Sequence, residues 1–364
     1  MKGNGSNDEV GAQSPSRRTV LKSTLAGSAL LGLAAATGMP EFARAAETGS
    51  SPFPMHPKWH FVFVNHVTTN PFFVPTQYGI QDACELLGCT YQWTGSQRSI
   101  ASEMVNSMNA AITSHADAIA VALVDQHAFN GPTDRALKAG IPVFSYNADV
   151  ASNHRLAYIG QNLYDAGKAL GERIASLVDS GDVAGFIATP GQLNIQPRLD
   201  GAKDAIKASG KNIKLFEVAS GATVNEEFSR VESFYLGHPN VKGMFAVDAG
   251  STEAVGATMR KHNLVKKGVK AGGFDLLPGT LKDIHEGYLD FTIDQQPYLQ
   301  GFYTVLEMFL YKMSGGLTGP ANINTGLKFV TAGSVMPYLQ TKSRYEGNSS
   351  AVEMIHRSGP IAAG

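Results

Sequence analysis

Polar side chains recur in this sequence directly after short apolar runs that have the length of a β-strand. The residues that could contact a ligand are Asn70, Phe72, Phe73, Asn147, Gln161, Arg198, Asp248, Phe274, Asp275 and Gln295. Ionised carboxylates accept hydrogen bonds from hydroxyl groups, amides both donate and accept them, and a guanidinium donates in a fork. Phenyl rings can pack on the C–H faces of a sugar ring. These residue types therefore predict recognition of a small polyhydroxylated molecule.

The first of these runs shows which elements would position the residues. His60–Asn65 is rich in β-branched and aromatic residues, which suits a strand buried on both faces. Asn70 is a good helix N-cap, and Pro71 fits the first helical turn, where a missing N–H costs nothing. The stretch predicts strand, loop and helix, and ligands of open parallel sheets collect outside the carboxyl ends of the strands.

The same alternation continues along the chain and predicts an α/β fold with parallel sheets. Strands are expected at 61–65, 90–93, 118–123, 142–146, 183–188, 214–218, 243–247, 269–274, 290–294 and 328–331. Helices are expected at 72–87, 100–114, 128–139, 164–180, 197–208, 226–236, 251–262 and 298–313. The pattern makes two laps, so two similar Rossmann-like lobes joined by a hinge are expected, with a cleft between them.

The domain boundaries follow from the two laps. The first lobe is expected to comprise 58–161 and 296–330, and the second 162–295 and 331–340, with a polar tail at 341–364. A lone Asn or Asp after a strand is more often a turn former or a helix cap. Asp125 fits such a cap. It is the convergence of many polar groups on one edge of the sheets that favours a binding site.

The amino-terminal segment resembles an export signal. Ser16-Arg17-Arg18-Thr19-Val20-Leu21-Lys22 holds a twin arginine, 25–36 is mildly apolar, and Ala43-Arg44-Ala45 offers a cleavage site. Residues 1–45 are therefore expected to be a twin-arginine signal peptide, followed by a flexible lead at 46–57. The alternative is a basic tail. Export by this route would place the mature protein in the periplasm.

Composition and motifs exclude several other classes of function. Of 364 residues, 43% are hydrophobic and 17% charged, which is typical of a globular protein, and the net charge of −1 argues against a nucleic-acid partner. The G-x-G-x-x-G, P-loop, G-x-S-x-G and H-E-x-x-H patterns are missing. The ten histidines are scattered, so no metal or other cofactor is expected. Cys84 and Cys89 are interpreted as two buried thiols, with a disulfide as the alternative.

Four segments together resemble the type I periplasmic sugar-binding proteins, the ribose and galactose receptors of ABC transporters. They are Asn70-Pro71-Phe72-Phe73, Gly140-Ile141-Pro142-Val143 leading to Asn147, Gly273-Phe274-Asp275, and Thr292-Ile293-Asp294-Gln295-Gln296-Pro297. The resemblance covers about 58–331. It implies sugar contacts at Asn70, Phe72, Phe73, Asn147, Arg198, Asp248, Asp275 and Gln295, and a hinge contact at Gln161. It also implies a monomer that delivers its ligand to the membrane permease subunits of the transporter.

The sequence departs from the ribose receptors at three positions. Asn147 stands where that branch has an acid, Ala148 where it has an arginine, and Ala122 near its third-strand asparagine. Another pentose, a hexose or a polyol therefore fits as well as ribose. Two further functions stay open: a sensor that presents its ligand to a chemoreceptor or kinase, and a carbohydrate-modifying enzyme. Since no nucleophile or general-base pair is evident, we expect a binding protein.

Overall fold

The first strand forms where the apolar run predicts it. In a computed structural model, which describes residues 53–317 and 319–340, β1 spans His60–Asn65 and is buried along nearly its whole length. The predicted signal peptide at 1–45, part of the predicted lead and the tail at 341–364 lie outside the described residues. From Lys58 onward the chain forms one compact unit, to which the elements below belong.

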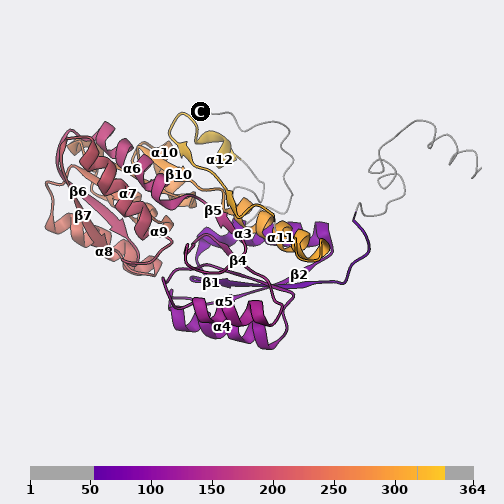
Figure 1. Ribbon diagram of the computed structural model, residues 1–364. Coiled ribbons are helices and arrows are strands. Elements are labelled where there is room, and N and C mark those ends of the chain that lie inside the picture. The colour runs from indigo at the N-terminus through magenta and orange to yellow at the C-terminus, as the bar shows by residue number, and fades with distance from the viewer. Residues whose placement is uncertain (1–52, 318, 341–364) are drawn as a thin grey trace, which may run out of the picture. The chain divides into compact units, whose positions relative to one another are not determined.

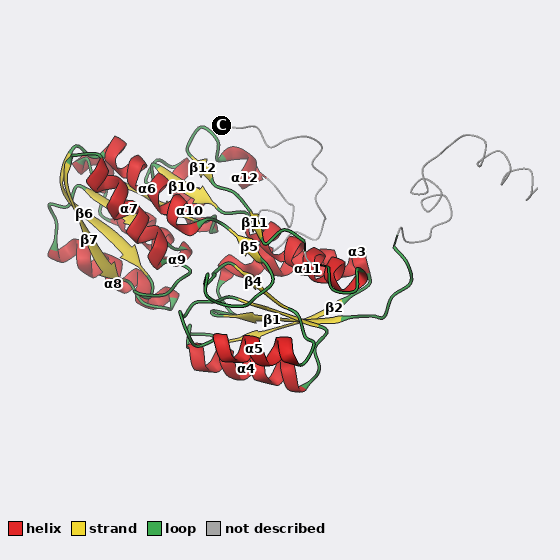
Figure 2. Cartoon of the chain, in the orientation of Figure 1, coloured by secondary structure: helices red, strands yellow, loops and turns green. Residues whose placement is uncertain are grey.

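Six strands form the first sheet, in the order β11-β5-β4-β3-β1-β2 (Figures 1 and 2). Its strands are β1, β2 (Thr90–Gly95), β3 (Ala118–Val121), β4 (Val143–Tyr146), β5 (Tyr158–Gly160) and β11 (Asn322–Asn324). All pair in parallel, so their carboxyl ends share one edge. The accompanying helices are α3 (Val74–Leu87), α4 (Ala101–Thr113), α5 (Asn130–Lys138) and α11 (Pro297–Met313). Figure 2 shows α4 and α5 on one face of the sheet and α3 and α11 on the other.

The second sheet also has six strands, in the order β12-β10-β9-β8-β6-β7. They are β6 (Ser180–Ile187), β7 (Asn212–Ala219), β8 (Gly243–Ala246), β9 (Lys270–Phe274), β10 (Phe291–Asp294) and β12 (Lys328–Val330). Only β12 is antiparallel, to β10. The associated helices are α6 (Leu163–Leu177), α7 (Gln196–Ala208), α8 (Val224–Gly237), α9 (Ala249–Lys261), α10 (Pro278–His285) and α12 (Met336–Gln340).

The alternation of side chains along β6 explains why helices cover both faces of this sheet. Val183 and Ile187 pack with α6 and α7, whereas Ala184 and Phe186 pack with α8, α9 and α10. Successive strand residues point to opposite faces, so a run that is apolar at every position requires a helix layer on each side. The predicted α/β architecture with two parallel sheets is confirmed.

The structure differs from the sequence prediction at one domain boundary. Residues 328–330 were expected in the first lobe as part of 296–330, but β12 pairs with β10 in the second sheet. Its partner lies more than thirty residues earlier in the chain, so local pattern carries no sign of this pairing. β5 and β11, each three residues long, and the helices α10 and α12 were not predicted. Within the described ranges, no helix is long and apolar enough to cross a membrane.

Both cysteines are buried free thiols, which matches the interpretation favoured from the sequence. Cys84 lies on α3, and Cys89 follows the turn at Gly88, which has a left-handed φ of 66°. Burial raises the pKa of Cys84 to about 12 and that of Cys89 to about 11. The two side chains therefore behave as small core residues.

Candidate functional site

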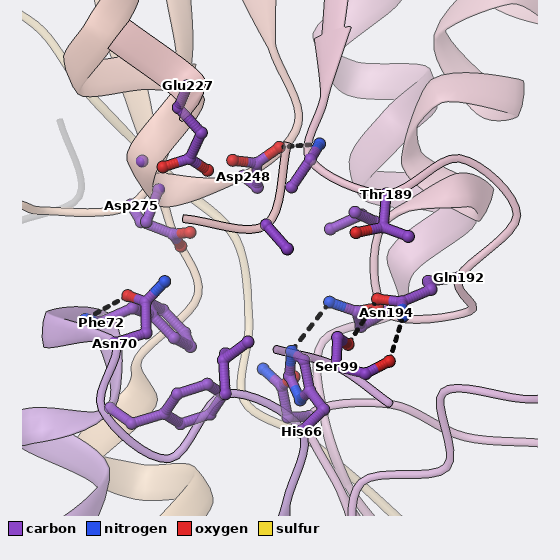
Figure 3. A pocket seen from close by; sticks show the side chains of 18 of the residues that line it. His66, Asn70, Phe72, Ser99, Thr189, Gln192, Asn194, Glu227, Asp248 and Asp275 are labelled. Carbon is purple, nitrogen blue, oxygen red and sulfur yellow. Dashed lines mark hydrogen bonds between the residues drawn. The ribbon is translucent and has the colours of Figure 1, made fainter. Parts of the chain in front are cut away.

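A pocket of about 550 Å³ lies at the carboxyl ends of strands from both sheets (Figure 3). This volume includes space that is open to solvent at the mouth of the pocket. Eight of the ten predicted site residues line it: Asn70, Phe72, Phe73, Asn147, Arg198, Asp248, Asp275 and Gln295. The carboxyl ends of the strands therefore bring together residues that lie more than 200 positions apart in the sequence.

The loop after β1 supplies the aromatic wall. Asn70 caps the short 3₁₀ helix Pro71–Phe73, because its Oδ1 accepts a hydrogen bond from the Phe72 N–H at 2.9 Å. This leaves the Nδ2 group of Asn70 available to a ligand. The rings of Phe72 and Phe73 meet edge to face at 4.7 Å, and His66 packs against Phe73 in the same way at 5.3 Å. The pair of rings is thus held rigidly by its neighbours.

A chain of amides connects the first sheet to the second. Asn147 follows β4, and its Nδ2 donates to Oε1 of Gln300 at 3.3 Å. Gln300 Nε2 donates to Oε1 of Gln295 at 3.0 Å, and Gln295 Nε2 donates to Oδ1 of Asp275 at 2.7 Å. Gln295 therefore orients the carboxylate of Asp275. Its own amide is largely satisfied within the protein.

Arg198 extends from α7 into the pocket and is only 2% exposed. Its Nη1 donates to the Val247 carbonyl at 3.0 Å, and its guanidinium lies 4.1 Å above the ring of Phe274. Burial lowers the pKa of Arg198, while Asp275 and Asp248 act in the opposite direction. An arginine resists deprotonation, so it remains the cation that faces these two carboxylates.

Two of the ten predicted site residues do not line the pocket. Phe274 is fully buried and packs in the core with Ile293, because its side chain points to the face of the sheet that α6 and α7 cover. Its ring supports Arg198 by a cation–π contact and does not line the pocket. Gln161 also lies behind the pocket wall: its Oε1 accepts from Arg198 Nη2 at 3.1 Å, and its Nε2 donates to the Gly326 carbonyl at 3.0 Å.

Two aspartates at the ends of β8 and β9 give the second sheet its acceptors. Asp248 is the N-cap of α9: its Oδ1 accepts from the Ser251 N–H at 3.0 Å, and its Oδ2 from the Ala188 N–H at 2.9 Å. Asp275 has a left-handed backbone, with φ 76°, and is 4% exposed. Burial raises the pKa of Asp275 to about 7, although Arg198 and the hydrogen bond from Gln295 oppose that shift.

The structure adds pocket residues that the sequence prediction missed. They are His66, Ser99, Thr189, Gln192, Asn194 and Glu227 (Figure 3). Thr189, Gln192 and Asn194 belong to the loop between β6 and α7, whose polar composition is that of any loop. For Glu227 the helical spacing of the sequence is a signal of burial: it lies four residues before Val231 and eight before Tyr235, on the buried stripe of α8.

Several of these missed residues join the two sheets across the pocket. Ser99 Oγ donates to Gln192 Oε1 at 2.7 Å, and Gln192 Nε2 donates to the Ser99 carbonyl at 3.0 Å. Asn194 Nδ2 lies 3.1 Å from Nε2 of His66. Burial lowers the pKa of His66 to about 3, so this imidazole is neutral and can accept that hydrogen bond. We refer to Ser99, Gln192, Asn194 and His66 as the clasp.

The pocket suits binding of hydroxyl groups. Arg198 Nε, His66 Nδ1 and Asn194 Oδ1 are buried and have no hydrogen-bond partner among the described residues. Such atoms are costly unless a ligand satisfies them. Over the same described ranges, no group of three or more His, Cys, Asp or Glu side chains is arranged to hold a metal ion. The arrangement is thus a set of donors and acceptors around an aromatic wall.

Comparison with known proteins agrees with this geometry. The family described as periplasmic binding protein domain matches residues 61–315. The xylose/arabinose-binding protein XylF of Sulfolobus acidocaldarius is 55% identical over 313 residues, which cover 82% of this chain and 77% of that protein. The ribose import binding protein RbsB of Escherichia coli is 25% identical over 229 residues, covering 63% of this chain and 76% of that protein.

A solved structure gives the same result. An ABC transporter solute-binding protein of Burkholderia graminis, in complex with D-arabinose, is 27% identical and matches with a TM-score of 0.72, covering 78% of this chain and 99% of that one. The predicted resemblance is therefore confirmed, together with the prediction of a binding protein and not an enzyme. This chain belongs to the periplasmic binding protein family, as an extracytoplasmic sugar-binding protein of an ABC transporter.

Proposed function

We propose that this chain captures a pentose of the xylose or arabinose type in the pocket and delivers it to the permease subunits of its transporter. The observation that carries the proposal is the convergence of amides, carboxylates, Arg198 and Phe72 from both sheets on one cavity. The choice of pentose is supported by the 55% identity to a xylose/arabinose-binding protein. The D-arabinose bound to a related structure supports the same ligand class.

The roles of the side chains follow from the atoms that the protein leaves available. Asp275 accepts from Gln295 through Oδ1, so Oδ2 can accept from a sugar hydroxyl. Asn70 offers Nδ2 because its oxygen caps the 3₁₀ helix. Arg198 offers Nε, and Phe72 offers its ring to the C–H face of the sugar. Gln161 and Phe274 hold Arg198 in place from behind.

Closure of two lobes around the ligand would follow from differential affinity. A sugar that contacts Asn70 on one side and Asp275 on the other gains the second set of contacts only when the two sheets are close, so binding favours the closed form. We assign 58–161 and 296–327 to one lobe, and 162–295 and 328–340 to the other, with the segments near Gln161, Gln295 and Gly326 as the hinge. The clasp adds ligand-independent contacts to the closed form.

We also propose that the chain is exported by the twin-arginine route and that it functions as a monomer. Arg17 and Arg18, the apolar stretch and Ala43-Arg44-Ala45 support this route to the periplasmic side of the membrane. Cleavage after Ala45 can be checked by mass spectrometry of the secreted protein, and the monomer by light scattering.

The test is a thermal-shift and calorimetric panel of xylose, arabinose, ribose, glucose and myo-inositol, with NMR of the sugar after incubation. Xylose or arabinose should raise the melting temperature most and be recovered unchanged. Arg198→Met should lose that shift because it removes the buried donor, whereas Arg135→Met, on the exposed face of α5, should keep it. A panel in which no pentose binds, or in which Arg198→Met binds as well as the parent, contradicts the proposal.

A further inference from the structure

Glu227 is a buried carboxyl group in the pocket wall that the sugar-binding roles above do not use. It lies in the first turn of α8, which begins with a capping box between Thr223 and Glu226. Glu226 points to the surface and pairs with Arg98 at 3.5 Å, whereas Glu227 is 3% exposed and lines the pocket. A single buried carboxyl in an otherwise apolar stripe requires a specific partner.

The neighbouring helix leaves a space for this carboxyl group. A Cβ atom at Gly250 would lie 1.9 Å from Oε2 of Glu227, so a larger residue there would displace the Glu227 carboxyl group. Gly250 does not have a positive φ, and the backbone itself therefore does not require glycine there. The glycine accordingly makes room for the glutamate at the amino-terminal turn of α9.

The partner of Glu227 is another carboxyl group. Burial raises the pKa of Glu227 to about 9, and the charge of the neighbouring Asp248 carboxylate adds to that shift. Both oxygens of Asp248 already accept backbone N–H groups, which suits the ionised form. The proton of the pair therefore resides on Glu227. Figure 3 shows the two carboxyl groups side by side at the pocket wall, with Asp275 below them.

The negative charges closest to Glu227 act in one direction. From α9, Asp248 and Glu253 face Glu227, and Glu226 precedes it on α8; each raises its pKa. Across the pocket lie Asp275 and Arg198, while His66 is neutral. The lining thus holds three carboxyl groups and one guanidinium. A neutral sugar brings no counter-charge and displaces water, so the closed pocket favours the protonated form of Glu227.

We propose that Glu227 is a further sugar-binding residue, which enters the closed pocket as a carboxylic acid hydrogen-bonded to Asp248, so that sugar affinity depends on the proton it holds. The inference rests on the proposed pentose function. The acid form fixes the orientation of Asp248 and keeps the number of negative charges in the pocket at two. Loss of the proton places a third negative charge against the bound sugar.

The test is calorimetric titration with D-xylose at pH 8 and pH 10. This interval lies above the titration of Asp275, near pH 7, and spans that of Glu227. If binding requires the protonated acid, a group that titrates near pH 9 should weaken the affinity by about tenfold over this interval. Glu227→Gln donates a hydrogen bond at every pH, so its Kd should change by less than about twofold between the same two pH values.

Two further variants separate this role from a general effect of alkali. Burial also raises the pKa of Glu307, which lies on α11 outside the pocket, so Glu307→Gln should weaken tenfold like the parent. Gly250→Ala displaces the Glu227 carboxyl and should lose the pH dependence. An equal Kd for the parent chain at both pH values, or a full tenfold change in Glu227→Gln, overturns the inference while leaving the pentose function intact. Absence of xylose and arabinose binding at pH 8 overturns both.

Discussion

The substitution Asp275→Asn should raise the free energy of unfolding of this protein and weaken its affinity for sugar. Asp275 is 4% exposed, and burial raises its pKa from 3.8 to about 7. The folded protein therefore keeps the proton up to about pH 7, whereas the unfolded chain releases it near pH 3.8. Folding takes up a proton between these values, so the stability contributed by this residue falls as pH rises through that interval and is level above it.

The size of the effect follows from the difference between the two pKa values. At 1.36 kcal/mol per unit, burial of Asp275 costs the apo protein about 4 kcal/mol at pH 8, where the carboxyl group is ionised in both states. The cost is about 1 kcal/mol at pH 4.5, where the carboxyl group must take up a proton on folding. Asn has the same shape, tolerates the left-handed φ of 76° and can still accept from Gln295. Asp275→Asn should therefore raise the free energy of unfolding by these amounts.

Sugar binding should respond in the opposite direction. A hydrogen bond to a charged acceptor contributes about 1.5–3 kcal/mol, so loss of the carboxylate should weaken pentose affinity by roughly tenfold to a hundredfold. Urea unfolding of the apo protein at both pH values, together with calorimetric titration at pH 8, measures both effects. Asp134→Asn, on the exposed pair with His154, serves as the control and should change neither quantity. A stability gain of the same size at both pH values, or unchanged affinity, would refute the reasoning.

Three other predictions address the aromatic wall, the clasp and the thiols. Phe72→Leu keeps most of the apolar volume but loses the flat ring, so pentose affinity should fall by about tenfold in calorimetry, whereas the exposed Leu86→Ala should leave it unchanged. Ser99→Ala removes one hydrogen bond between the sheets, so stopped-flow fluorescence should show that sugar dissociates about 2- to 10-fold faster. An unchanged dissociation rate would show that the clasp does not stabilise the closed form. Because burial raises the pKa of both thiols, Cys84 and Cys89 should resist a thiol reagent at pH 8 until the protein is unfolded, and rapid labelling of the native protein would contradict the packing described.

The parts of the fold that the sequence predicts are those set by local pattern. The apolar run of β1 and the Asn70-Pro71 start of the next helix define the first strand and its loop without reference to any other part of the chain. The carboxyl ends of parallel strands then gather by topology, which is why Asn147, Asp248 and Asp275 could be placed together. β5 and β11, with three residues each, are too short to show a period.

The parts that the sequence could not predict depend on contacts between distant segments. Phe274 was expected in the pocket, but which face of the sheet a strand residue takes is settled by the helices that cover it. Gln161 was expected to touch the ligand and instead supports Arg198. Glu227 becomes a pocket residue only because Gly250, on another helix, leaves room for it. None of these relations is visible in a window of local sequence.

The left-handed backbone at Asn147 and Asp275, which Ser99 shares among the pocket residues, limits how this receptor could acquire a new ligand. Asn147 has φ 63° and Asp275 has φ 76°, a conformation that Asn, Asp and Gly adopt readily and that β-branched residues resist. Natural variation at these two positions should therefore exchange one short polar group for another, with little scope to enlarge or reshape the cavity. Divergence toward other sugars should instead accumulate in the loop between β6 and α7, where Thr189, Gln192 and Asn194 have ordinary backbone angles and their side chains can change in size.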